Sequence, residues 1–485
     1  MAWRDHRPFL VLLGAGAALR VMVQLAFPPA FVFSDGPGYL GLVDDLTPSS
    51  YRVVGYGLVL RALSWVSDGV WLVAVTQHLL GLATAVLAYV LLRRWGVGSW
   101  VAAMATVPVL FDGMQLVLEH SVLSEVVFNL VVLAGVGALA WHRRPQLSTT
   151  VLAGLLLGAA ACVRLVGQPL LAAAVVFCLL AAATWRDRLV HAVVVTAAFL
   201  VPVLAYAGWY HHDHDAWALS DSGGRALYMR TTAWVDCSRF TMPDYERPLC
   251  PEQPVGHRLD PTEYGWHTPD ASHDLTPPDG VSVDDAMHDF AVRAIRAQPW
   301  DYARTVLRDV ALNFWPTRED RYEYDTADKW SFARYVDREQ LTGFTEPAYR
   351  SHGGSLPTVH QPGASWLATY GTKAYLWGPA LLALFLLAIA SLFVPGRRSA
   401  PRRSVIALLL MVGGGLMVAP DVTAEFVWRY QLPAILLVPM AAALGWTRMR
   451  SPRQEGTAAT PSTDWPNGGR TLRSTNRVVG TSQRS

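Results

Sequence analysis

Residues 9–39 read FLVLLGAGAALRVMVQLAFPPAFVFSDGPGY, and this stretch decides the fold class. An apolar run of about twenty residues, enough to cross the ~30 Å of hydrocarbon in a bilayer, leads into a turn at Gly36-Pro37-Gly38. The run is too long for a signal-peptide core and no small-residue cleavage site follows it, so we expect a retained first span. Asp35 is the first carboxylate after the run and stands where hydrocarbon should give way to water. Taken alone, it would be only a polar stop.

The composition agrees with a membrane protein. Of 485 residues, 52% are hydrophobic and only 16% are charged, whereas soluble domains carry about a quarter. Nineteen Trp and seventeen Tyr suit a chain with many membrane–water boundaries. A net charge of +2, with no long basic run before the tail, gives no sign of nucleic-acid binding. Lys occurs only at positions 329 and 373, which with much Ala, Val and Leu suggests a GC-rich, actinobacteria-like genome.

The predicted fold is an all-α polytopic membrane protein with about ten transmembrane helices. Arginines recur in the loops on one side, for example Arg93-Arg94 and Arg397-Arg398. By the positive-inside rule that side is the cytoplasm, so both termini should be cytoplasmic in a bacterial inner membrane. The expected spans fall near residues 9–29, 70–92, 98–112, 121–141, 148–164, 168–185, 189–209, 372–394, 404–420 and 430–447.

The spans divide the chain into parts. An N-terminal membrane module of about seven helices (1–209) should include a first extracytoplasmic loop (30–69), whose apolar spacing at 39–46 and 57–65 predicts two short helices on the membrane surface. An extracytoplasmic insert (210–371) follows, with a helical pair predicted from Asp284 to Phe314 after irregular loops. The remaining parts are about three C-terminal membrane helices (372–447) and a disordered cytoplasmic tail (448–485). Within the N-terminal module, we expect the link around Asp112 to His120 to be a short turn.

Two features of the insert suggest further chemistry. Cys237 and Cys250 make a disulfide plausible if the insert faces an oxidising compartment. His211, His212 and His214 stand close to two aspartates, but they match no defined metal-site spacing, and a solvated membrane exit is the favoured interpretation. No cofactor is predicted with certainty, the metal is unknown, and a divalent cation is left open.

Three acids lie near the outer membrane boundary. Asp35 follows the first span, while Glu119 and Glu125 flank the start of the fourth. Glu125 lies about a turn inside apolar sequence, where an ionisable group is expensive unless it faces a cavity or a partner. Two interpretations stay open: it pairs with a buried arginine such as Arg20 or Arg164, or two acids converge on one cavity and handle an acceptor proton.

Arginines at the same boundary could bind phosphate. Arg52 is in the first loop, Arg164 is in a tight turn and Arg429 precedes the last span. The planar guanidinium suits phosphate oxygens. Arg20, within the first span, is expected to extend its charge to the membrane surface.

With these residues in place, the chain resembles the GT-C superfamily of integral membrane glycosyltransferases, most nearly the branch with protein O-mannosyltransferases and lipid A aminoarabinose transferases. The resemblance covers residues 1–210 and 372–447. It rests on four short motifs: Ser34-Asp35 with Tyr39, Tyr51-Arg52 with Gly55-Tyr56-Gly57, Leu118-Glu119-His120 with Leu123-Ser124-Glu125, and Arg429-Tyr430 with Leu432-Pro433.

The resemblance implies a polyprenyl-phosphate sugar as donor, a glycan, lipid or protein as acceptor, and inverting transfer at the extracytoplasmic face among membrane lipids. Asp35 matches the family's first-loop acid, the candidate base, and Glu119 or Glu125 would be the supporting acid. Arg52, Arg164 and Arg429 are donor-phosphate candidates, and Tyr39, His120 and Tyr430 are substrate-binding candidates. The family's usual Asp-Glu pair is absent because Gly36 follows Asp35, which leaves metal dependence undecided.

Two other classes remain open. A transporter or flippase of lipid-linked glycans would suit the intramembrane charges of Arg20 and Glu125, but there is no internal repeat and the charge gathers at one face. A non-enzymatic envelope protein whose insert docks a partner is the second. The sequence does not name the sugar, the acceptor, the carrier length or the oligomeric state.

Overall fold

The computed structural model describes residues 3–266, 275–318, 327–336, 345–353, 355–395 and 402–450. Within these ranges the regular structure is helical, and the only bridge between extended segments joins Phe31 and Ser121. The predicted disordered tail lies outside the described residues from position 451 onward.

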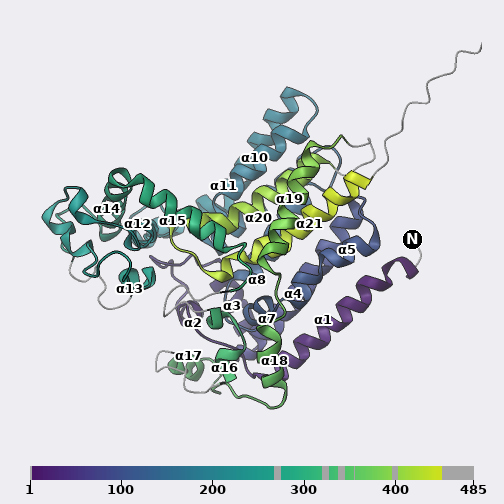
Figure 1. The fold of residues 1–485 in the computed structure, drawn as a ribbon, viewed down its shortest axis with the longest axis horizontal. Coiled ribbons are helices and arrows are strands. Elements are labelled where there is room, and N and C mark those ends of the chain that lie inside the picture. Colours follow the sequence, from purple (N-terminus) through teal and green to yellow (C-terminus); the bar gives the residue numbers. More distant parts are fainter. Residues whose placement is uncertain are drawn as a thin grey trace, which may run out of the picture. The chain divides into compact units, whose positions relative to one another are not determined.

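Apolar helices long enough to cross a membrane confirm a multi-pass protein (Figure 1). Five described helices have the required length, and four shorter apolar helices accompany them. The predicted span at 98–112 is broken into two short helices by Thr106 and Pro108, so the total of about ten spans stays a prediction. The membrane helices are α1 (Arg7–Ala26), α4 (Val70–Arg94), α5 (Ser99–Ala105), α6 (Val107–Phe111), α8 (Glu125–Leu139), α9 (Leu147–Val163), α10 (Leu170–Ala181), α11 (Trp185–His214), α19 (Gly378–Phe393), α20 (Arg403–Thr423) and α21 (Leu432–Arg450).

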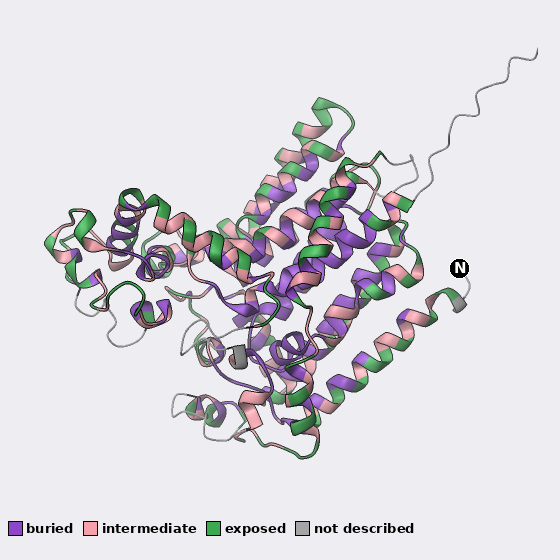
Figure 2. Ribbon diagram, viewed as in Figure 1, coloured by how far each residue is buried: buried purple, intermediate pink, exposed green. Residues whose placement is uncertain are grey.

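Burial differs among these spans in a way that fits a lipid surround. In the last span, 83% of the residues of its most apolar stretch are buried, whereas the share is 33% in α1 and 28% in α11, whose surfaces are largely exposed or half-buried (Figure 2). The exposed side chains of α1 are apolar, including Val11, Val21 and Leu25. Apolar residues facing outward are stable where hydrocarbon replaces water.

The short helices predicted in the first loop are present as α2 (Gly36–Asp44) and α3 (Gly55–Ser64). The prediction of a turn between Asp112 and His120 is wrong, because this segment forms the buried helix α7 (Gly113–Glu119). The Asp112 carboxylate accepts hydrogen bonds from the N–H groups of Met114 and Gln115 and so caps the start of the helix.

The insert is more helical than its first half suggested. Its predicted pair is confirmed as α14 (Val283–Ala297), which begins with a Ser282–Asp285 capping box, and α15 (Pro299–Leu312). The expectation of irregular loops between 211 and 279 is wrong in part, because α11 continues to His214 and further helices follow. These and the later helices are α12 (Gly223–Thr232), α13 (Pro261–Trp266), α16 (Ala333–Val336), α17 (Glu346–Ser351) and α18 (Gly363–Gly371).

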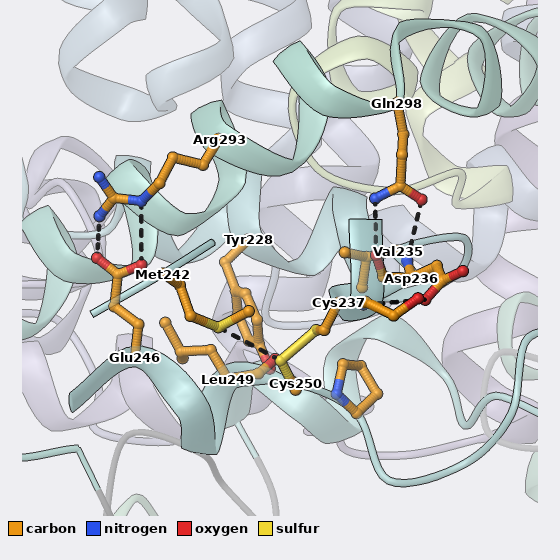
Figure 3. Close-up of a disulfide and its surroundings, with 12 residues drawn as sticks. Tyr228, Val235, Asp236, Cys237, Met242, Glu246, Leu249, Cys250, Arg293 and Gln298 are labelled. Carbon is orange, nitrogen blue, oxygen red and sulfur yellow. Dashed lines mark hydrogen bonds and ion pairs between the residues drawn. A yellow bond between two sulfur atoms is a disulfide. The ribbon is translucent and has the colours of Figure 1, made fainter. Parts of the chain in front are cut away.

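The predicted Cys237–Cys250 disulfide is present and closes a loop of the insert (Figure 3). Around it, Gln298 accepts the N–H of Asp236 and donates to its carbonyl, and Arg293 forms a two-point ion pair with the fully buried Glu246. These contacts surround a separate apolar core that includes Tyr228, Trp234 and Phe290. The insert therefore has a core of its own.

Candidate active site

Asp35 lies at the N-terminus of α2 but does not cap it. The backbone at Ser34 enters the left-handed region with φ of 53°, and Asp35 then occupies the N-cap position without any side-chain bond to the helix. Its carboxylate instead accepts hydrogen bonds from Arg52 at 3.0 Å and from Arg429 at 2.9 Å. A β-carbon at position 38 would lie 2.8 Å from the Arg52 guanidinium, so Gly38 makes room for it. The Asp35 side chain therefore binds two arginines and does not cap the helix, although Asp is a preferred N-cap residue.

The arginines hold Asp35 in its charged form. Burial alone would raise the pKa of its carboxyl group, but the positive charges of Arg429, Arg52 and Arg164 lower that pKa well below the ordinary value of 3.8. The free site thus contains an aspartate that stays ionised at any physiological pH.

Glu125 joins the same group through Arg429. One of its oxygens lies 2.5 Å from Arg164 and 3.5 Å from Arg429. The expected pairing with a buried arginine is thus present, and it belongs to the group that contains Asp35. Ser124 accepts a hydrogen bond from Arg164 at 3.1 Å and lies 3.1 Å from the Tyr39 hydroxyl. We call Asp35, Arg52, Glu125, Arg164 and Arg429 the boundary cluster.

Aromatic rings surround the boundary cluster. The Arg429 guanidinium lies 5.0 Å from the ring centre of Trp330 and 5.3 Å from that of Tyr430. Arg164 lies 5.9 Å from the same Tyr430 ring. Trp330 is almost completely buried and also packs against Phe33. Such rings exclude water from the guanidinium groups and strengthen their electrostatic action.

Glu119 belongs to a different group. It is fully buried and its two oxygens lie 2.6 Å from Arg20 and 2.9 Å from His78. The expectation that Arg20 extends to the membrane surface is wrong, because its guanidinium also donates to the carbonyls of Gly16, Val109 and Leu110 inside the bundle. Gly81 provides the space for Glu119, since a β-carbon there would overlap the carboxylate.

His120 lies in this second group as well. Its Nδ1 is 3.2 Å from His78, and its Nε2 donates to the carbonyl of Phe27 at 2.7 Å. No described contact joins His120 to the boundary cluster, so the structure separates two candidates, Glu119 and His120, from the other predicted site residues.

The segment before Asp35 is fixed from two sides. Phe31 donates to the carbonyl of His120 at 2.8 Å and accepts from Val122 at 2.9 Å. From the insert, the hydroxyl of Tyr349 accepts the N–H of Val32 at 2.7 Å and donates to the carbonyl of Ala30 at 2.9 Å. Asp35 therefore projects from a segment that both the membrane module and the insert hold in place.

Three participants were not predicted. Ser124 lies in the motif Leu123-Ser124-Glu125, and its position next to Glu125 could have indicated that it belongs to the site. His78 lies in the middle of an apolar span, where an ionisable residue already suggests a partner. Trp330 carries no signal, because its part of the insert has no recognisable pattern.

The histidines at the end of α11 do not form a metal site with the residues described here. No group of three or more His, Cys, Asp or Glu side chains in the described ranges could hold a metal ion. His211 stacks on Trp217, and His214 stacks on Tyr210 and donates to the carbonyl of Pro48.

Part of the chain is similar to a known protein family. Residues 62–215 match the model of the Dolichyl-phosphate-mannose-protein mannosyltransferase family. The range runs from the end of α3 through α11 and includes Glu125 and Arg164, but not Asp35. A search of curated proteins finds no match.

Solved structures give distant likenesses. The S. cerevisiae protein O-mannosyltransferase complex bound to the sugar donor has 17% identity and a TM-score of 0.35, covering 48% of this chain and 37% of its own. The Archaeoglobus fulgidus oligosaccharyltransferase tethered to an acceptor peptide has 13% identity and a TM-score of 0.43, covering 91% and 50%. ArnT from Cupriavidus metallidurans has 14% identity and a TM-score of 0.33, covering 90% and 77%. The chain thus spans half or less of the first two, and TM-scores this low add no argument.

The apolar helices show a multi-pass membrane protein, and over residues 62–215 the chain is similar to the Dolichyl-phosphate-mannose-protein mannosyltransferase family, in line with the resemblance that the sequence indicated.

Proposed function

We propose that this protein transfers a sugar from a polyprenyl-phosphate donor to an acceptor hydroxyl, with inversion, at the extracytoplasmic end of its membrane helices. The family match supports a lipid-linked donor, since the name of the matched family includes one. The extracytoplasmic side is supported by the positive-inside rule, because the arginine-rich loops of the sequence are expected on the other side.

The observation that carries the proposal is the charge balance of the boundary cluster. Among the residues that the structure describes, three guanidinium groups of this cluster face two carboxylates, which leaves one positive charge at a site lined by aromatic rings. An uncompensated positive charge in a partly buried site is costly and suits an anion that arrives from outside. The phosphate of a lipid-linked sugar would supply that charge at the membrane boundary.

Donor binding would also activate the base. In the free site, Arg52 and Arg429 hold the Asp35 carboxylate, and their charge makes it a weak proton acceptor. A donor phosphate that attracts these guanidinium groups would loosen their hold, and the pKa of Asp35 would rise toward its ordinary value. The acid would then be a competent base only when the donor is present.

The acceptor oxygen forms a bond to the anomeric carbon while the bond from that carbon to the phosphate oxygen breaks, and the lipid phosphate leaves with the electron pair. Asp35 takes the acceptor proton, and Arg429 and Arg164 stabilise the charge that grows on the phosphate. Glu125 orients these two arginines, as its distances of 3.5 and 2.5 Å allow.

A reconstituted assay tests the proposal. The purified protein in proteoliposomes would be given radiolabelled polyprenyl-phosphate hexose or pentose with an envelope extract as acceptor, and lipid phosphate release and acceptor labelling would be measured. We expect both to depend on the protein. Mass analysis of envelope glycans and glycoproteins in a deletion strain would identify the product. Donor movement across the bilayer without sugar transfer would instead support the flippase alternative.

A further inference from the structure

The outward face of α15 has an unusual composition for a surface of the insert. Trp300 is 82% exposed, Leu307 66% and Trp315 (just beyond the helix) 50%. Arg304 and Arg308 are exposed between them. Within α15, Trp300, Arg304, Leu307 and Arg308 are separated by the three- and four-residue steps that put side chains on one side of a helix. Neither arginine has an ion pair among the residues that the structure describes.

The opposite face of α15 is tied to the ends of two membrane spans. Near its start, the Tyr302 hydroxyl donates to the carbonyl of Val422, and after its end Asn313 donates to the buried carboxylate of Asp421 at 3.0 Å. Both acceptors lie in the last turn of α20. The indole of Trp377, the N-cap residue of α19, donates to the carbonyl of Pro316 at 2.7 Å.

These contacts place α15 at the level where the membrane helices end. Figure 1 shows α15 between α14 of the insert and the end of α20. A helix held at this level, with tryptophans and a leucine exposed, has the composition of helices that lie in the headgroup region of a membrane.

From this placement we propose that the outward face of α15 binds anionic phospholipid headgroups of the membrane in which the protein is embedded. Trp300 and Trp315 would lie at the headgroup level, Leu307 would reach the acyl boundary, and Arg304 and Arg308 would pair with lipid phosphates. Two cations near the surface favour anionic over zwitterionic lipid through charge complementarity. The proposal does not depend on the proposed transferase activity.

A site-directed probe tests this. In a Cys162→Ala/Cys178→Ala background, which removes the two buried free thiols but keeps the disulfide, a bimane fluorophore is attached at Leu307→Cys. The matched control carries it at Val255→Cys, which replaces an exposed apolar residue of the insert outside α15. Both proteins are reconstituted in nanodiscs of phosphatidylcholine with or without phosphatidylglycerol, with a nitroxide on the headgroup of a tracer lipid.

We expect at least about threefold stronger quenching at position 307 than at 255, with a further increase when phosphatidylglycerol is added. Arg304→Gln with Arg308→Gln should abolish that lipid-dependent increase while leaving the melting temperature unchanged. Equal quenching at the two positions would show that α15 faces water or another partner. Quenching at 307 without any dependence on phosphatidylglycerol or on the two arginines would overturn the anionic-headgroup proposal.

Discussion

Replacing Asp35 by Asn would separate binding from chemistry in the boundary cluster. The amide is close in size to the carboxylate and can still accept a hydrogen bond from Arg52 or Arg429, so the local fold should persist. The negative charge and the proton-accepting oxygen are lost. The site then carries three guanidinium groups against one carboxylate, two net positive charges instead of one.

The substitution should strengthen donor binding and lower turnover. A unit charge about 8 Å from a phosphate, at an effective dielectric constant of about 20, is worth roughly 2 kcal/mol, so the donor should bind about 30-fold more tightly or at least no more weakly. Loss of a positioned general base lowers turnover by about 10²- to 10⁴-fold. We therefore expect KM for the donor to fall or hold while kcat collapses.

Donor-dependent transfer in proteoliposomes, with donor concentration varied, would give kcat and KM separately, and melting temperature would report on folding. Asp45→Asn is the matched control, because Asp45 is an exposed acid of the same loop with no ion pair in the described structure. Near-wild-type kcat in Asp35→Asn would refute the assignment of the base. A KM that rose steeply with kcat unchanged would mean that Asp35 binds substrate and takes no proton.

Three further predictions concern the pH dependence of transfer, the buried pair of Glu119 with Arg20, and the disulfide of the insert. Because the pKa of Asp35 is lowered in the free protein, kcat/KM should not fall as pH drops from 7 to about 5. The bound donor draws the arginines away from Asp35, so kcat should begin to fall with decreasing pH at a higher pH than kcat/KM does. Profiles of both constants against pH check this, and a fall of both at the same pH would contradict it. Glu119→Gln leaves a buried Arg20 partly unpaired and should lower the free energy of unfolding by about 3–5 kcal/mol. The control Glu346→Gln, at an exposed ion pair, should lower it by under about 1 kcal/mol. Thermal unfolding measures both, and equal losses would contradict the burial argument. Cys237→Ser with Cys250→Ser opens a loop with a sequence separation of 13 and should cost the insert about 2–4 kcal/mol, seen as faster proteolysis there than in the intact protein.

The sequence predicted what depends on local pattern. Spans are visible because hydrocarbon requires long apolar runs, and α14 and α15 are visible because apolar residues recur at helical spacing. Helix α7 escaped prediction because it is short and buried on all sides, so no polar face marks it. The pairing of Arg20 with Glu119 joins positions 99 residues apart, and no local rule could select it over a surface location.

The same limit applies to the choice between Glu119 and Glu125 as the supporting acid, because it depends on contacts between distant parts of the chain. Both acids flank one turn and lie near one membrane boundary, so spacing alone makes them equivalent. Their surroundings differ: Glu119 is neutralised by Arg20 in a fully buried group, where charge has a structural use, while Glu125 shares Arg429 with Asp35. Only the second arrangement lets a ligand that engages Arg429 act on both carboxylates, so Glu125 is the acid that we expect to support transfer.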